Sequence, residues 1–139
     1  MSGFSKTLNI IIADDSKEFL EGLQYMLSEN EDYSIVDVAS NGEQLLNSDN
    51  LTITDLVITD IEMPKINGIE VAKKINYRYP NIYMIALTMY LDQVYLTEIV
   101  EAGFKGFIYK PDIAVNLYDT ITRVLNNEYV FPEKLKFNK

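Results

Sequence analysis

The sequence predicts an α/β protein with a parallel sheet that is covered by helices on both faces. Five short apolar runs, rich in β-branched residues, alternate with five segments whose apolar residues follow helical spacing. The first of these runs is apolar almost throughout, as in strands that are buried on both faces. At 139 residues, with 47% apolar and 24% charged residues, the chain has the size and composition of one globular domain.

The five strands are expected at the apolar runs. The second run alternates polar and apolar residues, which is typical of a strand nearer the edge of a sheet. The third ends at Asp60, before a turn that contains Pro64 and Gly68. In chain order, the strands are expected at residues 8–13, 33–39, 56–59, 82–87 and 107–109.

Helices are expected between and after these strands. Asp15 or Ser16 can cap the first helix, whose inward positions include Leu20 and Leu23. A short second helix begins at Asn41-Gly42, and an irregular segment over 48–54 follows it. Leu51 and Ile53 are its expected apolar anchors, and the remaining helices are expected over 68–79, 91–102 and 113–126.

The composition excludes several classes of chemistry. The chain has no cysteine and no histidine, so thiolate chemistry, disulfides and imidazole catalysis are excluded. A formal charge of −9 argues against nucleic-acid binding by this domain itself, since such affinity rests on Lys and Arg. No apolar run approaches the roughly 18 residues of a membrane span, and no signal peptide is recognisable at the start. We therefore expect a cytoplasmic protein.

Charged and hydroxyl side chains follow the predicted strands at the points where they end. Asp14 and Asp15 follow the first strand, Asp60 the third, Thr88 the fourth and Lys110 the fifth. Because the carboxyl ends of parallel strands meet at one edge of a sheet, these residues are expected to form one site. Three converging carboxylates repel one another unless a cation neutralises them, and their oxygen atoms suit Mg²⁺ or Mn²⁺.

This constellation predicts phosphorylation of a carboxylate. Asp60 would be the nucleophile, with the metal ion and Lys110 neutralising the phosphoryl oxygens and Thr88 donating a hydrogen bond. The backbone carbonyl of Glu62 is a further expected metal ligand. Each residue alone has an ordinary structural explanation, such as a helix cap or a turn. Their joint placement at four strand ends favours a functional site.

Four motifs make the sequence resemble the receiver domain of two-component response regulators over residues 8–127. The resemblance implies a flavodoxin-like (βα)5 fold with strand order 2-1-3-4-5. A flavodoxin-like receiver is itself a standard example of that order. The motifs are Ala13-Asp14-Asp15-Ser16, Thr59-Asp60-Ile61-Glu62-Met63-Pro64, Ala86-Leu87-Thr88 and Phe107-Ile108-Tyr109-Lys110-Pro111.

The resemblance implies a role for each motif residue. Asp60 would accept a phosphoryl group from a phosphohistidine of a sensor histidine kinase, in a reaction that needs Mg²⁺ held by Asp14 and Asp15. Lys110 and Thr88 would bind the phosphoryl group. Phe107 would reorient when Thr88 moves, and the Lys110-Pro111 peptide bond would be cis. Such a protein catalyses only its own phosphorylation and dephosphorylation, so it is a switch and not an enzyme acting on an external substrate.

The finer resemblance is to receivers of NarL/LuxR-type transcription regulators, in which a DNA-binding effector domain follows. It implies an N-terminal extension over 1–7, a receiver over 8–128, and a tail or linker over 129–139. A homodimer on phosphorylation is a further expectation. Whether the chain is a truncated receiver or a stand-alone one stays open. Four tyrosines lie on the face that receivers commonly use for output, namely Tyr90, Tyr95, Tyr109 and Tyr118.

Three other functions compete with this interpretation. A Mg²⁺-dependent phosphatase of the dehalogenase-like type would have its nucleophile after the first strand and a second Asp two residues on. A flavodoxin would have a hydroxyl- and glycine-rich phosphate loop where this chain has Asp14 and Asp15. A phosphorylation-independent interaction module is the third, but such degenerate receivers usually lose a pocket residue.

Overall fold

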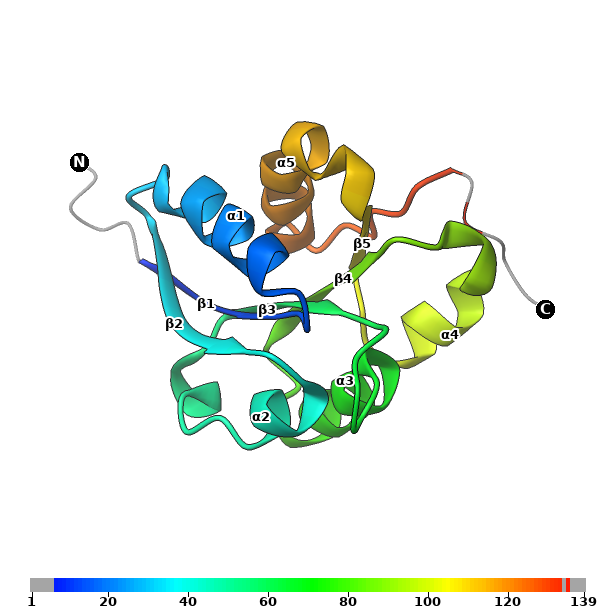
Figure 1. Cartoon of the computed structure of the whole chain (residues 1–139), viewed down its shortest axis with the longest axis horizontal. Coiled ribbons are helices and arrows are strands. Elements are labelled where there is room, and N and C mark those ends of the chain that lie inside the picture. The colour runs from blue at the N-terminus through cyan, green and yellow to red at the C-terminus, as the bar shows by residue number, and fades with distance from the viewer. Residues whose placement is uncertain (1–6, 134, 136–139) are drawn as a thin grey trace.

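The protein is a three-layer sandwich with a central five-stranded sheet (Figure 1). The structure is a computed structural model and describes residues 7–133 and 135. All strand pairs are parallel and the order is β2-β1-β3-β4-β5, so the predicted fold class and the edge position of the second strand are confirmed. The strands are β1 (Leu8–Ala13), β2 (Tyr33–Ala39), β3 (Leu56–Asp60), β4 (Tyr83–Thr88) and β5 (Gly106–Tyr109).

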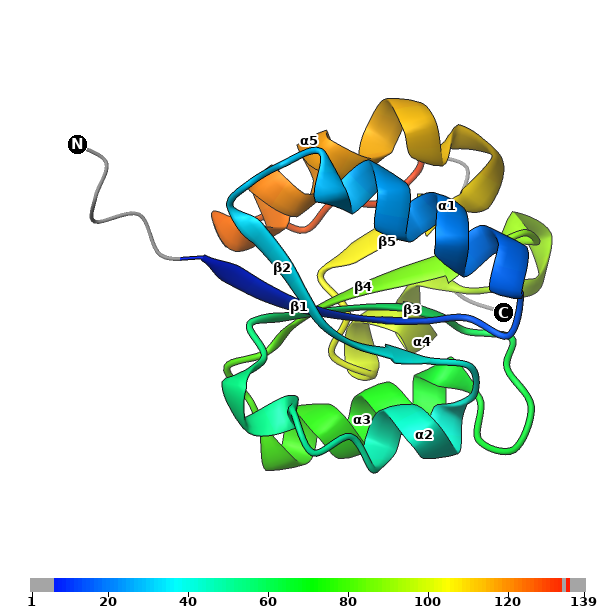
Figure 2. The same ribbon diagram turned by 60° about the vertical axis from the view of Figure 1, so that its left-hand side comes forward.

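Helices cover both faces of the sheet. Figure 2 shows α1 and α5 on one face and α2, α3 and α4 on the other. Short 3₁₀ turns lie between the larger elements, namely η2 (Leu51–Ile53), η3 (Leu91–Gln93) and η4 (Lys110–Asp112). The helices are α1 (Lys17–Ser28), α2 (Gly42–Leu46), α3 (Gly68–Arg78), α4 (Leu96–Glu101) and α5 (Ile113–Leu125).

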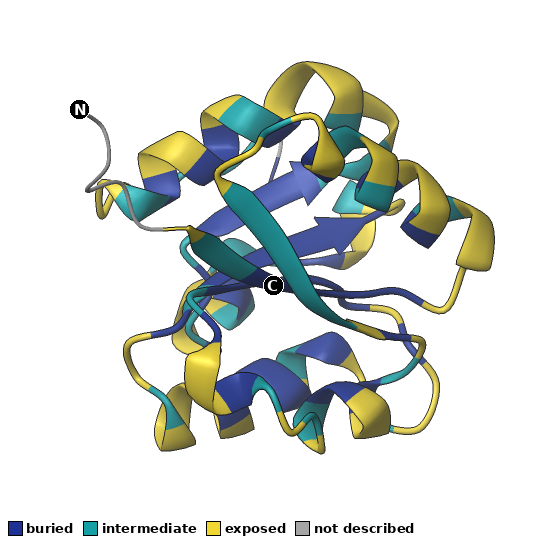
Figure 3. Cartoon of the chain, turned by 90° about the vertical axis from the view of Figure 1, so that its left-hand side faces the viewer, coloured by how far each residue is buried: buried dark blue, intermediate teal, exposed yellow. Residues whose placement is uncertain are grey.

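The alternation of side chains along each strand divides the core in two. Ile11 and Ala13 of β1 point to the cluster under α2, α3 and α4, whereas Ile10 and Ile12 point to the cluster under α1 and α5. Figure 3 shows the inner strands buried and β2, the edge strand, mostly of intermediate exposure. The inner strands are apolar throughout because each of their faces is covered by helices.

Two local predictions were wrong. The expected helix over 91–102 is divided into η3 and α4, because the backbone at Val94 and Tyr95 is extended. The extended backbone accompanies a buried Val94 side chain, and β-branched residues favour extended backbone because a helix restricts their χ1 to one rotamer. In the segment before β3, Leu51 is 3% exposed but Ile53 is 52% exposed. A single 3₁₀ turn therefore brings only one of the two expected anchors into the core.

The chain after α5 returns to the sheet. Val130 forms a parallel bridge with Gly106, and its N–H donates to the Lys105 carbonyl at 2.8 Å. Its own carbonyl accepts the Phe107 N–H at 3.0 Å. Phe131 packs against the same cluster that contains Phe107. The boundary predicted at residue 128 stays a prediction, and most of the predicted extension over 1–7 lies outside the described residues.

None of the helices in the described part of the chain is long and apolar enough to cross a membrane.

Two glycines give a matched test of this packing. A Cβ on Gly68 would lie 2.3 Å from the Asp60 carbonyl oxygen, whereas a Cβ on Gly22 would meet nothing within 4 Å. We predict that Gly68→Ala lowers the free energy of unfolding by about 1–3 kcal/mol, the usual cost of overpacking. Gly22→Ala should raise it by about 0.5–1 kcal/mol, because alanine favours helix interiors. Urea denaturation measures both, and equal effects would contradict this account.

Candidate functional site

The residues predicted from the strand ends meet at one edge of the sheet. Asp14 follows β1, Asp60 ends β3, Thr88 ends β4, and Lys110 follows β5. The register holds these ends at one level: Ala13 lies beside Thr59, and Thr88 beside Tyr109. Because all strands are parallel and staggered by so little, residues from four distant parts of the sequence share one crevice.

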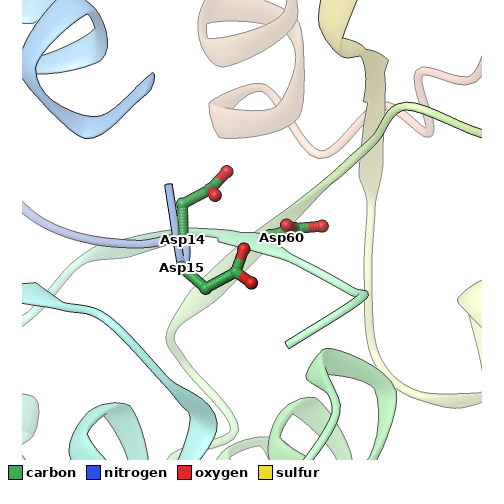
Figure 4. A group of neighbouring side chains, drawn as sticks. All are labelled: Asp14, Asp15 and Asp60. Atoms are coloured by element: carbon green, nitrogen blue, oxygen red, sulfur yellow. The ribbon is translucent and has the colours of Figure 1, made fainter. Parts of the chain in front are cut away.

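Three carboxylates form the centre of the site (Figure 4). Asp14, Asp15 and Asp60 each offer an oxygen atom, and these atoms lie within 4.8 Å of one another. Asp14 is fully buried and Asp60 is 3% exposed, whereas Asp15 faces solvent. Two of the carboxylates are positioned by backbone donors. The Ser16 N–H donates to Asp14 Oδ1 at 2.8 Å, and the Glu62 N–H donates to Asp60 Oδ1 at 3.0 Å.

Lys110 supplies the positive charge that these buried carboxylates require. Its Nζ lies 2.6 Å from Asp14 Oδ2 and 3.0 Å from Asp60 Oδ2. Burial alone would lower the pKa of Lys110, but its contacts with Asp14 and Asp60 outweigh burial and raise it. The ammonium therefore stays charged. Burial, together with the negative charge of Asp60, raises the pKa of Asp14 although Lys110 opposes the shift.

The donor set fits a hard divalent cation. Asp14 Oδ2 is buried, and the Lys110 ammonium 2.6 Å away is shared with Asp60. The site therefore contains three carboxylates, from Asp14, Asp15 and Asp60, but, among the described residues, one ammonium in contact with them, so its negative charge is only partly neutralised. Oxygen ligands with excess negative charge are the environment that Mg²⁺ and Mn²⁺ prefer. These three residues would hold the ion.

A second cluster, around Thr88, adjoins the acidic centre. The Thr88 hydroxyl donates toward the Glu62 carboxylate, with Oγ1 at 3.0 Å from Oε1 and 2.9 Å from Oε2. The same hydroxyl oxygen accepts the Tyr90 N–H at 3.0 Å. Thr88 is fully buried. Its hydroxyl is therefore held between the end of β3 and the start of the loop after β4.

Glu62 carries a shifted pKa. Although the residue as a whole is exposed, burial of its carboxylate raises the pKa from 4.5 to about 7, and the negative charge of Asp60 acts in the same direction. The hydrogen bond from Thr88 and the charge of Lys110 oppose the shift without cancelling it.

The structure also places the remaining predicted residues. Phe107 lies on β5 and is buried, beside Ala86 of β4. Its backbone therefore lies two residues before the end of β5, inside the core cluster under α2, α3 and α4. Ser16, and not Asp15, caps α1, since its Oγ accepts the Phe19 N–H at 3.2 Å. Asp15 is thereby left available to the acidic cluster.

The expected cis bond before Pro111 is wrong. The described residues contain no cis peptide bond, so the Lys110–Pro111 bond is trans. Pro111 lies at the start of η4, where a proline needs no N–H partner and its fixed φ suits the turn. The trans form is also the ordinary preference of such bonds.

Two contacts in the site were not predicted from the sequence. The Lys110 Nζ lies 4.7 Å from the centre of the Phe19 ring, so an aromatic residue of α1 lies over the ammonium. Phe19 follows the helical apolar spacing of α1, and nothing in that spacing separates it from an ordinary core residue. The other is the hydrogen bond from the Thr88 hydroxyl to the Glu62 carboxylate. The sequence placed Glu62 beside the reaction centre but did not give its side chain a partner.

A hollow of about 520 Å³ lies between β5, α5 and the segment around Phe131. Phe107 and Tyr109 line it, but none of the acidic residues of the site does. The chemistry of the site therefore lies at the strand ends and not in this hollow.

A model of the response regulator receiver domain family matches residues 10–122. The chain belongs to this family. Among curated relatives, the transcriptional regulatory protein DegU of Brevibacillus brevis is 28% identical over 127 residues, which cover 91% of this chain and 54% of that protein. The transcriptional regulatory protein LnrK of Bacillus subtilis (strain 168) is 30% identical over 92% of this chain and 58% of its own length. The chain thus spans little more than half the length of these relatives.

Solved structures agree with this assignment. The non-phosphorylated receiver domain of the stress response regulator RcsB from Escherichia coli superposes with a TM-score of 0.81 at 26% identity, covering 92% of this chain and all of that one. A chain of the CheX–CheY–BeF₃⁻–Mg²⁺ complex from Borrelia burgdorferi superposes with a TM-score of 0.77 at 26% identity, covering 85% of this chain and 89% of that one. A LuxR-family response regulator from Aurantimonas sp. SI85-9A1 shares the fold, with a TM-score of 0.84 at 22% identity over 94% and 93%.

The expected family and its flavodoxin-like fold are therefore confirmed. The relatives are transcriptional regulatory proteins, and receiver domains bind Mg²⁺ in an acidic pocket of the kind that Asp14, Asp15 and Asp60 form here.

The shifted Glu62 predicts a specific pH dependence of stability. Between pH 4.5 and about 7 the unfolded chain releases the Glu62 proton while the folded protein retains it, so folding stability falls as pH rises. Glu62→Gln is permanently neutral and lacks this dependence. We expect the stability of wild type relative to Glu62→Gln to fall as pH rises across this window and to level off above it.

Urea denaturation without divalent cations, repeated at several pH values, measures this difference. Titrating groups that do not interact with Glu62 are common to both proteins and cancel. A difference that is constant with pH, or that rises, would contradict the assigned shift.

Proposed function

We propose that this domain is a phosphorylation switch in which Asp60 accepts a phosphoryl group. The observation that carries the proposal is the position of Asp60: a buried carboxylate within 4.8 Å of two others and in contact with the Lys110 ammonium. One Asp60 oxygen is held by the Glu62 N–H, and the other faces Lys110. This arrangement supports attack on phosphorus more than any structural role, because it concentrates charge at a buried point.

The transfer needs three contributions from the chain. An oxygen of Asp60 forms a new bond to phosphorus while the bond from phosphorus to the leaving group of the donor breaks, and that group departs with the electron pair. Lys110 lies where it can pair with a phosphoryl oxygen as well as with Asp60. The Thr88 hydroxyl can donate to another phosphoryl oxygen once it is free of Glu62.

Asp14 and Asp15, with Asp60 and the carbonyl of Glu62, are the proposed ligands of Mg²⁺. When bound, the ion neutralises the negative charge that accumulates on the phosphoryl oxygens in the transition state. Phosphorylation would then displace Thr88 and, through it, Phe107, and so change the surface around β5.

The donor and the output are proposed from the family. A histidine kinase phosphohistidine is the expected donor and the cytoplasm the expected compartment. Because relatives of about twice this length are transcriptional regulatory proteins, we propose that the domain controls a DNA-binding effector domain. Family membership favours this over the phosphatase and flavodoxin interpretations. The alternative is an interaction module that acts without phosphorylation. A test of whether Asp60 can be phosphorylated distinguishes this module from the switch.

Incubation with acetyl phosphate tests the chemistry. We expect wild type to gain one phosphoryl group in the presence of Mg²⁺, with acetate as the leaving group, and Asp60→Asn to gain none. The exposed Asp49, which lies after α2, provides the control, and Asp49→Asn should be phosphorylated as wild type is. Intact mass spectrometry measures the adduct. No adduct on wild type under any condition would reject the switch in favour of an interaction module.

Mg²⁺ should also stabilise the folded protein, because it binds the carboxylate cluster that only folding assembles. At ten times its dissociation constant we expect a gain of about 1.4 kcal/mol in the free energy of unfolding. Asp15→Asn removes an exposed ligand without disturbing the core and should reduce this gain sharply. Urea denaturation with MgCl₂ measures it, with NaCl at equal ionic strength as the control for screening. Equal gains in both proteins would count against the assigned ligands.

A further inference from the structure

The Thr88 hydroxyl is fully engaged within the protein. A hydroxyl has one hydrogen to donate, and that of Thr88 is directed at the Glu62 carboxylate, whose two oxygens lie 3.0 Å and 2.9 Å from Oγ1. The hydroxyl oxygen also accepts the Tyr90 N–H. Thr88 therefore cannot donate to a phosphoryl group on Asp60 while it keeps its present partner.

Glu62 is held in this position by the nucleophile itself. Its N–H donates to Asp60 Oδ1 at 3.0 Å, so the backbone of Glu62 is tied to the carboxylate that would be phosphorylated. From there its side chain spans the gap between the end of β3 and the end of β4. The carboxylates of Glu62 and Asp60 are close enough for the negative charge of Asp60 to act on Glu62.

We propose that the Glu62 side chain is a gate on the phosphorylation of Asp60. In the unphosphorylated protein it occupies the Thr88 hydroxyl, and it must release that hydroxyl before Thr88 can bind the phosphoryl group. This inference rests on the proposed function. It makes Glu62 a positioning residue, which acts through Thr88 and does not itself react.

Two physical effects let an ionised Glu62 slow the phosphorylation of Asp60. The bond from Thr88 to an ionised carboxylate is charge-assisted and stronger than one between neutral groups. A phosphoryl group on Asp60 also brings further negative charge beside Glu62, and like charges repel. Competition for the single Thr88 hydrogen needs Thr88, whereas repulsion does not. The two effects can therefore be separated by mutation.

A double-mutant cycle makes this separation. Four proteins are compared: wild type, Glu62→Ala, Thr88→Val and the double variant, in which valine preserves the shape of threonine but has no hydroxyl. The measurement is the rate constant of phosphorylation by acetyl phosphate with Mg²⁺, followed by intact mass. We expect Glu62→Ala to raise this rate constant about tenfold when Thr88 is present. That factor corresponds to the lower end of the free energy that a hydrogen bond to a charged group contributes. With Val at position 88 the same change should have much less effect.

Glu62→Gln provides a graded variant, because the amide still accepts from Thr88 but carries no charge. Its rate should lie between those of wild type and Glu62→Ala. Glu70 is a matched control, an exposed glutamate at the start of α3, and Glu70→Ala should leave the rate unchanged. Circular dichroism and urea denaturation establish that each variant is folded. If Glu62→Ala does not fold, Glu62→Gln replaces it in the cycle, with a smaller expected acceleration because the amide still accepts from Thr88.

The outcomes separate the gate from the proposed function. An equal acceleration in both backgrounds would mean that Glu62 acts by charge alone, and it would overturn the gate while leaving the switch standing. No acceleration in either background would overturn it as well. Failure of all the proteins, Glu62→Ala included, would overturn the gate together with the proposed function.

Discussion

The buried Lys110 ammonium is the contact on which the site depends. Asp14 is fully buried and Asp60 nearly so, and two carboxylates brought out of water beside each other would otherwise protonate or move apart. Lys110 lies within ion-pair distance of both, with the Phe19 ring over it. Breaking a buried pair of this kind leaves an uncompensated charge, which costs several kcal/mol. One ammonium cannot neutralise three carboxylates, and the remaining negative charge would attract the proposed cation.

The sheet brings these charges together at little entropic cost. Strands that are apolar on both faces are fixed between two helical layers, so their ends are rigid, and close contacts hold the loop after β3 against them. Gly68 shows how tight this is, since its Cα approaches the Asp60 carbonyl more closely than any side chain permits. The rigid core positions the carboxylates, and the neighbouring loops are left to change.

Two groups connect the acidic centre to the rest of the molecule. Thr88 ends β4 and is held by Glu62, and Phe107 lies on the next strand, where its N–H is bonded to the Val130 carbonyl. Under the proposed switch, a displacement passed from Thr88 to Phe107 would reach this edge of the sheet through the hydrogen bond between Phe107 and Val130. Residues 130 and 131 cover that edge. They come after α5, the helix in which the match to the family model ends.

The periodicity of the apolar runs and the residue at each strand end are local properties, so the sequence by itself predicted the α/β class and the residues of the acidic centre. The family and the strand order followed from the resemblance of its motifs to receiver domains. The sequence could not determine the contacts made across space. The extended break at Val94 and the exposure of Ile53 accompany the packing of neighbouring elements, and the sequence left the cap of α1 open between Asp15 and Ser16. The Glu62 carboxylate shows the difference most clearly. Its position beside Asp60 is written in the chain, but its bond to Thr88 joins residues 26 positions apart. Only the tertiary structure decided that bond, since a side chain chooses its partner by distance in space and not by distance along the chain.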